Sequence, residues 1–342
     1  MATIYGVAAS AGVSPKTAAR ILAGESPKSK SRKKILDCAR KLGYVRNRQA
    51  ANLRTGRTGL IGVIVPYISN PFYTKYLQEL HNVLHASGYE PLIACSFGVA
   101  DVTLTALRSF AMYNVDGLVL DISEGPLTPA IEGELARFQK GGHAIVVTGG
   151  QGHSTPYDHL YLNNRAAIAK VVEHLASRGH RRIGFLGGGP GSLVVKALPG
   201  NLNIQNRFEG FKRALRDRRL PMRPHWVSLG DPALPNVSER ANRLVRHPDR
   251  PSALVCSSDM IAMVAVKAAL EGHLKVPEDF AIAGFDDIDQ AALLNPSLTT
   301  VRQPLATMAA AAVELLLLRL GSPKRPVQER QYEAQLVARA SA

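Results

Sequence analysis

The sequence has few of the residues on which disulfide frameworks and membrane spans depend. Its 342 residues include only three cysteines, Cys38, Cys95 and Cys256, and no C-x-x-C motif. Reduced structural thiols are expected, which favours the cytoplasm. The most apolar stretch, residues 309–320, contains two charged residues and is shorter than the roughly 20 residues that cross a bilayer. A buried or interface helix is expected there instead of a membrane span.

Motifs for catalysis and nucleotide binding are also missing. The stretch GGGPG at 187–191 fits neither a dinucleotide-binding fingerprint nor a P-loop, no G-x-S-x-G elbow occurs, and the ten histidines show no H-E-x-x-H spacing. The acidic pair Asp286-Asp287 has no evident nucleophile or metal partner in the sequence. We therefore expect no enzyme activity, no metal site and no cofactor.

Positive charge is concentrated at the N-terminal end. Residues 1–59 contain thirteen Lys and Arg against two acidic residues, so they carry +11 of the formal net charge of +15. A local excess of this size indicates a polyanionic partner, and the turn signals nearby favour nucleic acid over a membrane surface. Because Lys16 and Arg20 precede any sustained apolar run, no signal peptide is expected, and the cytoplasm is the predicted location.

Residues 3–24 predict two short helices joined by a tight turn. Thr3 is the candidate N-cap of the first helix, and Gly12 supplies the permissive backbone of the turn. Ser14 followed by Pro15 is a strong start for the second helix, because proline at the first helical position loses no hydrogen bond. Gly24 is the predicted end of that helix. The residues expected to face inward are Val13, Ala18, Ile21 and Leu22.

The outward face of the second helix carries Lys16, Thr17 and Arg20. This arrangement fits a recognition helix in the major groove of DNA, with its first turn toward the base edges. The alternative is a small helical hairpin whose charges only keep it soluble. A third helix, expected from Ser29 to about Leu42, has cations in its first turn although they oppose the helix dipole there, which indicates phosphate contact. The cations are Lys30, Arg32, Lys33 and Lys34, and the apolar face consists of Ile35, Leu36, Ala39 and Leu42.

Residues 1–60 resemble the DNA-binding headpiece of the lac repressor / galactose repressor family of bacterial transcription regulators. The matching motifs are TIYGVAASAGVS from Thr3, Thr17 with Arg20, LGY at 42–44, and NRQAANLRTGRT at 47–58. The resemblance implies a hinge at about 46–54 that folds as a short helix on DNA. It also implies that Leu53 enters the minor groove, where contacts to the bent duplex offset the cost of unstacking. The alternative for Leu53 is an ordinary anchor to the core.

The chain departs from the family pattern at a few headpiece positions. Arg46 stands where many members have proline, Ala18-Ala19 replace Val-Ser, and Gly6 replaces an aspartate, although glycine inside a helix costs about 1 kcal/mol relative to alanine. These differences leave the operator sequence and the hinge rigidity open, and DNA binding stays the prediction. The residues expected to contact DNA are Thr3, Tyr5, Ser14, Pro15, Lys16, Thr17, Arg20, Lys30, Asn47, Arg48, Leu53 and Arg54.

From Leu60 onward, apolar runs alternate with amphipathic segments. Continuous apolar runs are typical of parallel strands that helices cover on both faces, so two successive α/β units are predicted. The predicted strands are 60–65, 91–95, 117–120, 144–147 and 159–162 in the first unit and 182–187, 225–229, 253–257 and 281–285 in the second. The predicted helices are 72–87, 101–112, 128–140, 164–178, 205–218, 237–246 and 259–271.

The expected α/β fold joins an all-α helix-turn-helix headpiece to a two-lobed core of doubly wound parallel sheets. The family resemblance implies the same core, which is like that of periplasmic sugar-binding proteins. A ligand is expected in the cleft between the lobes, beyond the carboxyl ends of the strands. The headpiece with its hinge is expected at 1–58, with the helix-turn-helix at about 3–24, and the effector-binding and dimerisation core is expected at 59–342. Within the core, the N-lobe is expected at about 60–162 plus 293–320 and the C-lobe at about 163–292 plus 321–342.

Polar and aromatic residues just after strands are the candidates for effector contact. SNPFY at 69–73 matches a family signature whose aromatic pair, Phe72 and Tyr73, can face the effector. Packing of Phe72 on the sheet is the alternative. Arg207 matches a family position at which an arginine binds the effector through its planar fork of donors. Asp286 matches a family position at which a carboxylate accepts hydrogen bonds from the effector. Four weaker candidates at comparable strand ends are Asn163, where many members have aspartate, Ser258, Asp259 and Gln303.

Together these features predict a sequence-specific DNA-binding transcription regulator, expected to be a repressor, that acts as a homodimer on a pseudo-palindromic operator. Its effector is expected to be a sugar or sugar derivative, with a purine or another metabolite as the alternative. Two alternatives belong to other classes, namely a bilobed small-molecule receptor without a transcriptional role and a nucleoid-type architectural DNA binder. A footprint over one symmetric site favours the regulator, and uniform protection of any duplex favours the architectural protein.

Arg20→Ala is expected to weaken binding to an operator far more than binding to random-sequence DNA, because the side chain is predicted to read base edges. Loss of a good base contact corresponds to about 1–3 kcal/mol, or roughly 5- to 150-fold in operator affinity. Gel-shift titrations of the two duplexes measure the two losses. Equal losses on both duplexes would reject the base-reading role of Arg20.

Overall fold

The chain divides into two compact units, Met1–Thr58 and Gly59–Ala342, and each unit has a hydrophobic core of its own. The first unit is small and helical, and the second is a larger α/β body with parallel sheets. The computed structural model describes residues 2–22, 31–44, 57–125, 127–188, 201–230 and 234–342.

The described residues of the first unit form three short helices. Thr3 caps the first helix by accepting a hydrogen bond from the Gly6 N–H (3.2 Å), and Ser14 Oγ accepts one from the Thr17 N–H (3.1 Å) at the start of the second. Gly12 has a φ of 67°, a left-handed value that glycine adopts easily, and forms the turn between them. The predicted caps and turn are confirmed, while Gly24 lies outside the described residues. The helices are α1 (Ile4–Ala11), α2 (Pro15–Leu22) and α3 (Arg32–Lys41).

Small and branched apolar side chains from all three helices form the core of this unit. Two expectations for α3 are wrong. The helix begins at Arg32 with Ser31 as its N-cap, so it starts three residues later than predicted. Leu42 is 44% exposed because it lies at the C-cap, and Cys38 and Tyr44 pack against the core instead. The buried core residues are Val7, Ala8, Ala11, Ala18, Ile21, Ile35 and Ala39.

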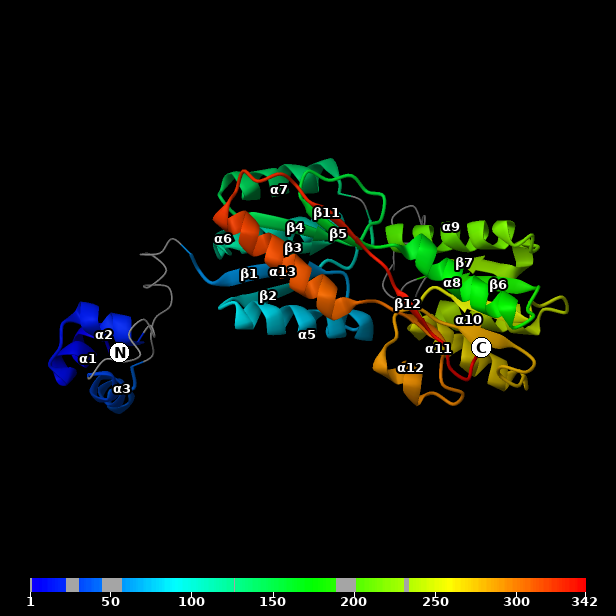
Figure 1. Cartoon of the computed structure of the whole chain (residues 1–342), viewed down its shortest axis with the longest axis horizontal. Helices are drawn as coiled ribbons and strands as arrows, with labels where there is room; N and C mark the ends of the chain where they lie inside the picture. Colours follow the sequence, from blue (N-terminus) through cyan, green and yellow to red (C-terminus); the bar gives the residue numbers. More distant parts are fainter. Residues whose placement is uncertain (1, 23–30, 45–56, 126, 189–200, 231–233) are drawn as a thin grey trace. The chain divides into compact units, whose positions relative to one another are not determined.

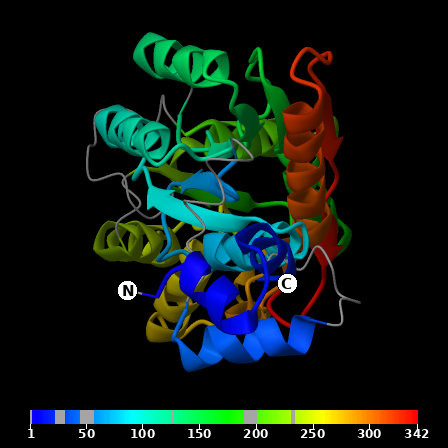
Figure 2. The same ribbon diagram turned by 90° about the vertical axis from the view of Figure 1, so that its left-hand side faces the viewer.

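The first lobe of the second unit is a parallel sheet with the strand order β11-β5-β4-β3-β1-β2 (Figure 1). Helices α5 and α13 cover one face and α6 and α7 the other, as the view along the sheet makes visible (Figure 2). Successive residues of β1 serve opposite faces, because Val63 packs with α5 and α13 while Ile64 packs with α6 and α7. The strands are β1 (Leu60–Val65), β2 (Glu90–Cys95), β3 (Gly117–Asp121), β4 (Ala144–Thr148), β5 (Asp158–Leu162) and β11 (Glu329–Tyr332). The helices are α5 (Pro71–Ala86), α6 (Ala100–Met112), α7 (Pro129–Lys140) and α13 (Leu305–Gly321).

The second lobe is a smaller parallel sheet with the strand order β7-β6-β8-β9. Phe185 of β6 packs toward α8 and α9, and its neighbour Leu186 packs toward α10 and α11, so this sheet is also covered on both faces (Figure 1). The predicted class of fold is therefore confirmed. The strands are β6 (Ile183–Gly187), β7 (Val227–Leu229), β8 (Ala253–Cys256) and β9 (Ala281–Ala283). The helices are α8 (Asn164–Ser177), α9 (Leu202–Asp217), α10 (Leu234–Arg246), α11 (Asp259–Glu271) and α12 (Asp289–Leu293).

Among the predicted elements of this lobe that have different bounds in the structure are the strand at 225–229 and the helix at 205–218. The strand predicted at 225–229 is reduced to β7, because Pro224–Trp226 forms a 3-10 turn whose indole donates a hydrogen bond to the Asp249 carbonyl (2.7 Å). Helix α9 begins at Leu202, three residues before the predicted start, with Asn201 as its N-cap. The second change brings additional side chains of α9 to the cleft.

The C-terminal segment departs from the expected lobe division. Strand β11 pairs with β5 in the first sheet, although residues 321–342 are expected in the C-lobe. The physical reason is a buried ion pair in which Arg319 Nη2 donates to both carboxylate oxygens of Asp158 (2.9 and 3.0 Å). Asp158 also accepts the Gln328 N–H (2.8 Å), so the chain after α13 is held along β5.

Residues near 300 also depart from the expected lobe division, which places them in the N-lobe. Strands β10 (Thr300–Arg302) and β12 (Gln335–Val337) form an antiparallel pair. Thr299 forms a bridge with Ala283 at the end of β9, so this pair continues from the sheet of the second lobe. The chain therefore crosses between the lobes three times, after β5, before α13 and after β11 (Figure 1).

Candidate functional site

The carboxyl ends of the strands in both lobes meet at one cavity. Its walls come from the segments after β1, β3, β6, β8 and β9, and from the first turns of α9. The free volume is about 50 Å³, far below the roughly 300–1,000 Å³ of a typical ligand pocket. The lining residues are Tyr67, Asn70, Phe72, Tyr73, Ser123, Glu124, Gly188, Asn201, Asn203, Ile204, Arg207, Ser257, Ser258 and Asp286.

Arg207 of α9 lies at the centre of this cavity and is only 7% exposed. Its Nε donates to Asn164 Oδ1 (2.8 Å), its Nη1 donates to the Ser257 carbonyl (2.5 Å), and its guanidinium stacks on the Phe285 ring at 3.7 Å. Its Nη2 lies 3.7 Å from Asp286 Oδ1. Each of these contacts compensates part of the cost of burying a cation.

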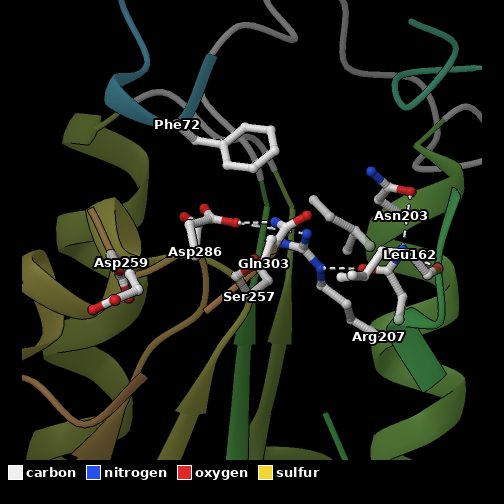
Figure 3. A network of polar contacts seen from close by, with 12 residues as sticks. Phe72, Leu162, Asn203, Arg207, Ser257, Asp259, Asp286 and Gln303 are labelled. Atoms are coloured by element: carbon white, nitrogen blue, oxygen red, sulfur yellow. Dashed lines mark hydrogen bonds and ion pairs between the residues drawn. The ribbon is translucent and has the colours of Figure 1, made fainter. Parts of the chain in front are cut away.

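Asp286 is held by its backbone and by two side chains. Its φ of 118° is a value that non-glycine residues rarely adopt, and its N–H donates to the Val301 carbonyl (2.9 Å). Gln303 Nε2 donates to Asp286 Oδ1 (2.8 Å), and both side chains point toward Arg207 in Figure 3. Burial raises the pKa of Asp286 to about 7, although the Arg207 guanidinium acts in the opposite direction. Backbone strain of this kind is often retained at binding sites.

The first lobe contributes two aromatic rings. Asn70 caps α5 by accepting a hydrogen bond from the Phe72 N–H (3.0 Å), which places the rings of Phe72 and Tyr73 edge to face with their centroids 5.0 Å apart. Tyr73 is buried, and Phe72 extends over the Asp286 carboxylate (Figure 3). Phe72 also packs against apolar residues of both lobes, so the packing role considered as an alternative is present together with the cavity position.

Two carboxyl groups outside the predicted set, those of Asp121 and Glu124, lie at the last residue of β3 and just after it. Asp121 accepts hydrogen bonds from the Ser123 N–H (2.9 Å) and the Thr148 hydroxyl (3.2 Å), and burial raises the pKa of Asp121 to about 6. Burial, followed by the negative charge of Asp121, raises the pKa of Glu124 to about 7. Both residues follow the strand predicted at 117–120, in the stretch GLVLDISE (117–124). The criterion used above for effector contacts, a polar residue just after a strand, therefore selects them as well.

The structure does not bring every predicted effector residue to the cavity. Asn163 caps α8 and donates to Glu333 (2.8 Å), while its neighbour Asn164 contacts Arg207. Asp259 is fully buried, accepts the Thr300 hydroxyl (2.5 Å) and the Ile288 N–H (2.9 Å), and is turned away from Arg207 (Figure 3). Asn163 and Asp259 therefore serve the framework of the second lobe. The predicted residues that line the cavity are Phe72, Tyr73, Arg207, Ser258 and Asp286. Gln303 lines a recess that adjoins the cavity and shares Phe72 with it.

The headpiece presents most of its described candidate DNA contacts at exposed positions of α1 and α2. Tyr5 is 71% exposed, and Lys16 and Arg20 are exposed on α2. Thr3, Ser14 and Pro15 are also exposed, while Thr17 is half-buried and hydrogen bonded to Ser14 through the two hydroxyls (2.8 Å). The predicted contacts outside the described residues are Lys30, Asn47, Arg48, Leu53 and Arg54.

The part of the chain that the structure describes shows neither a metal cluster nor a membrane span. No group of three or more His, Cys, Asp or Glu side chains there is arranged to hold a metal ion. None of the described helices combines the length and the apolar character that a membrane span requires.

Known proteins resemble this chain over nearly its whole length. A family model described as a periplasmic binding protein-like domain matches residues 172–342. The HTH-type transcriptional regulator MalR of Streptomyces coelicolor is 32% identical, with 98% of this chain and 95% of MalR covered. The ribose operon repressor of Haemophilus influenzae is 28% identical, with 100% of this chain and 98% of that protein covered. The solved structure of a LacI-family transcriptional regulator from Lactobacillus casei with bound glucose has a TM-score of 0.69 and 26% identity, with 83% of this chain and 99% of that one covered.

Glu124→Gln is expected to raise the melting temperature more at pH 8 than at pH 5. The pKa of Glu124 is raised from 4.5 to about 7 in the folded chain, so the stability that its protonated form provides is complete below about pH 4.5 and is lost as the pH rises through about 7. Glutamine stays neutral, and the gain at pH 8 should be on the order of 1–3 kcal/mol. Calorimetry of the wild type and of Glu124→Gln at pH 5 and pH 8 measures the gain in stability. The control is Glu132→Gln, on the exposed face of α7. An equal gain at both pH values would contradict this account.

Proposed function

The chain belongs to the lac repressor / galactose repressor family of bacterial transcription regulators, and from this premise we propose that it is a sugar-responsive repressor that acts as a cytoplasmic homodimer. The observation that carries the proposal is the cavity built around Arg207 and Asp286. A guanidinium donates to hydroxyl oxygens, a carboxylate accepts from hydroxyl groups, and an aromatic ring such as Phe72 packs on the apolar face of a sugar.

Two of the related proteins support a carbohydrate as the effector. One is named a ribose operon repressor, and the structure of another contains glucose. The amide side chains of Asn201 and Asn203 add further donors and acceptors to the cavity wall, as a polyhydroxylated ligand needs. We expect the ligand to be bound and released unchanged, without a catalytic step.

The headpiece supplies the proposed DNA contacts. Its exposed Lys16 and Arg20 lie on the short helix that Ser14 and Pro15 begin, as expected of a recognition helix. One such helix covers half of an operator, so two copies related by a two-fold axis would read a pseudo-palindrome. The proposed roles of Leu53 in the minor groove and of residues 46–54 as a hinge remain part of this proposal.

A ligand in the cavity would contact both lobes and thereby favour one angle between them. Phe72 and Tyr73 belong to the first lobe, whereas Arg207 and Asp286 belong to the second. A ligand shifts such an equilibrium only by its difference in affinity for the two arrangements. Coupling of about 1–3 kcal/mol would change the operator affinity by roughly 5- to 150-fold.

Arg207→Met is expected to abolish the response to the effector, because it removes the central donors and keeps an unbranched side chain. A thermal-shift screen of sugars, sugar acids, sugar phosphates and nucleobases on the full chain identifies the effector, and gel shifts then measure operator affinity with and without it. The wild type and Arg213→Met, a control at a side chain 78% exposed on the same helix, should both respond. The proposal fails if no sugar or sugar derivative changes the operator affinity, or if Arg207→Met responds like the wild type.

A further inference from the structure

The wall of the cleft formed by the first lobe is acidic. Glu124 lines the cavity beside Tyr67 and Tyr73, and Asp121 lines a recess that adjoins it. The cavity and the recess share Phe72 and Ser123, so the two carboxyl groups lie along one continuous surface. Within the described residues, no ion pair joins either carboxylate to a cation.

The charged side chains that the structure describes in the cleft do not balance. Asp121, Glu124 and Asp286 place three carboxyl groups around one guanidinium, that of Arg207, among the described residues that line the cavity and the recess. Arg207 is already engaged by hydrogen bonds and by its ion pair with Asp286, so little of its charge is left for the first lobe. Desolvated carboxylates without a cation take up protons, in agreement with the raised pKa values of the partly buried Asp121 and Glu124.

An independent feature of the same recess also indicates a missing polar partner. Tyr76 of α5 lines the recess with Asp121 and is 4% exposed. Its hydroxyl lies next to that of Thr148 but makes no hydrogen bond of normal geometry with any of the described residues. An unpaired buried hydroxyl costs about 1–3 kcal/mol, so a ligand group that reached it would recover that cost. The recess therefore offers both negative charge and an unused hydroxyl.

We propose that the effector carries a protonated amino group beside its hydroxyl groups, as an amino sugar does, and that Glu124 and Asp121 bind this ammonium group. Arg207 and Asp286 then bind hydroxyl groups from the opposite wall. This inference rests on the proposed function, because it concerns the same cleft. An ammonium group supplies three donors and one positive charge, so it donates hydrogen bonds to both carboxylates and offsets half of their negative charge. A neutral sugar would leave the two carboxylates without a cation, and an acidic sugar would add a like charge.

The test compares matched sugars on the full-length chain by isothermal titration calorimetry at pH 6.5. The probes are glucose, galactose and mannose, each with its 2-amino and its 2-acetamido derivative. The 2-acetamido derivative retains the nitrogen but loses the charge. At least one amino sugar should bind about 10-fold or more tightly than both uncharged relatives, the gain typical of a charged hydrogen bond.

Glu124→Gln and Asp121→Asn should each reduce the preference for the amino form, while Glu132→Gln on the exposed face of α7 should keep it. A second readout is proton release. The charged groups that face Glu124 are Asp121 and Arg207, and binding of an ammonium group lowers the carboxyl pKa values. Protons should therefore pass to the buffer, and the heat of binding should differ between phosphate and MOPS. This difference should shrink in Glu124→Gln.

The outcomes separate this inference from the proposed function. If every neutral sugar binds as tightly as its amino form, or if none of the amino sugars binds, the ammonium site is wrong. A neutral sugar that still changes the operator affinity would preserve the sugar-responsive repressor. Retention of the full preference by both Glu124→Gln and Asp121→Asn would also overturn the assignment of these residues. Thermal melts of the variants verify that each is folded.

Discussion

The burial of the Arg207 guanidinium is the constraint on which the cleft depends. A cation in this position must be compensated from several directions, and the second lobe supplies the start of α8 through Asn164, the end of β8 through Ser257, and the segment after β9 through Phe285 and Asp286. These contacts hold three separate segments at fixed distances from α9. The second lobe therefore presents a preorganised half-site, and binding needs little further ordering there.

The first lobe completes the site, and its connection to the second lobe allows movement. The side chains of Lys75 in α5 and Asp289 in α12 form an ion pair between the lobes (2.9 Å), but they are 43% and 83% exposed. Exposed ion pairs of this kind contribute about 0–1 kcal/mol, so this pair alone does not hold the lobes together. The three crossing segments keep the lobes connected while the cleft opens. The ligand can then supply the free energy that selects one arrangement.

The sequence predicts the framework well and the candidate site only in part, because the framework signals are local. Buried parallel strands such as 60–65 require continuous apolar runs, whereas β11 is a polar edge strand held by the distant Arg319–Asp158 pair, and no apolar run marks it. At the site, a shift of one position decides whether a side chain caps a helix, as Asn163 does, or faces the cleft, as Asn164 does. Such contacts become visible only when the strands are placed in space.

The proposed function requires that the cleft and the DNA-binding headpiece form one linked system. Linkage requires that operator DNA change the affinity for the effector by the same factor by which the effector changes the affinity for the operator. Calorimetric titration of the effector into the free protein and into the protein saturated with operator duplex measures this factor. The account predicts a change of roughly 5- to 150-fold that equals the factor from the DNA titrations. An effector affinity that is the same with and without operator would contradict it.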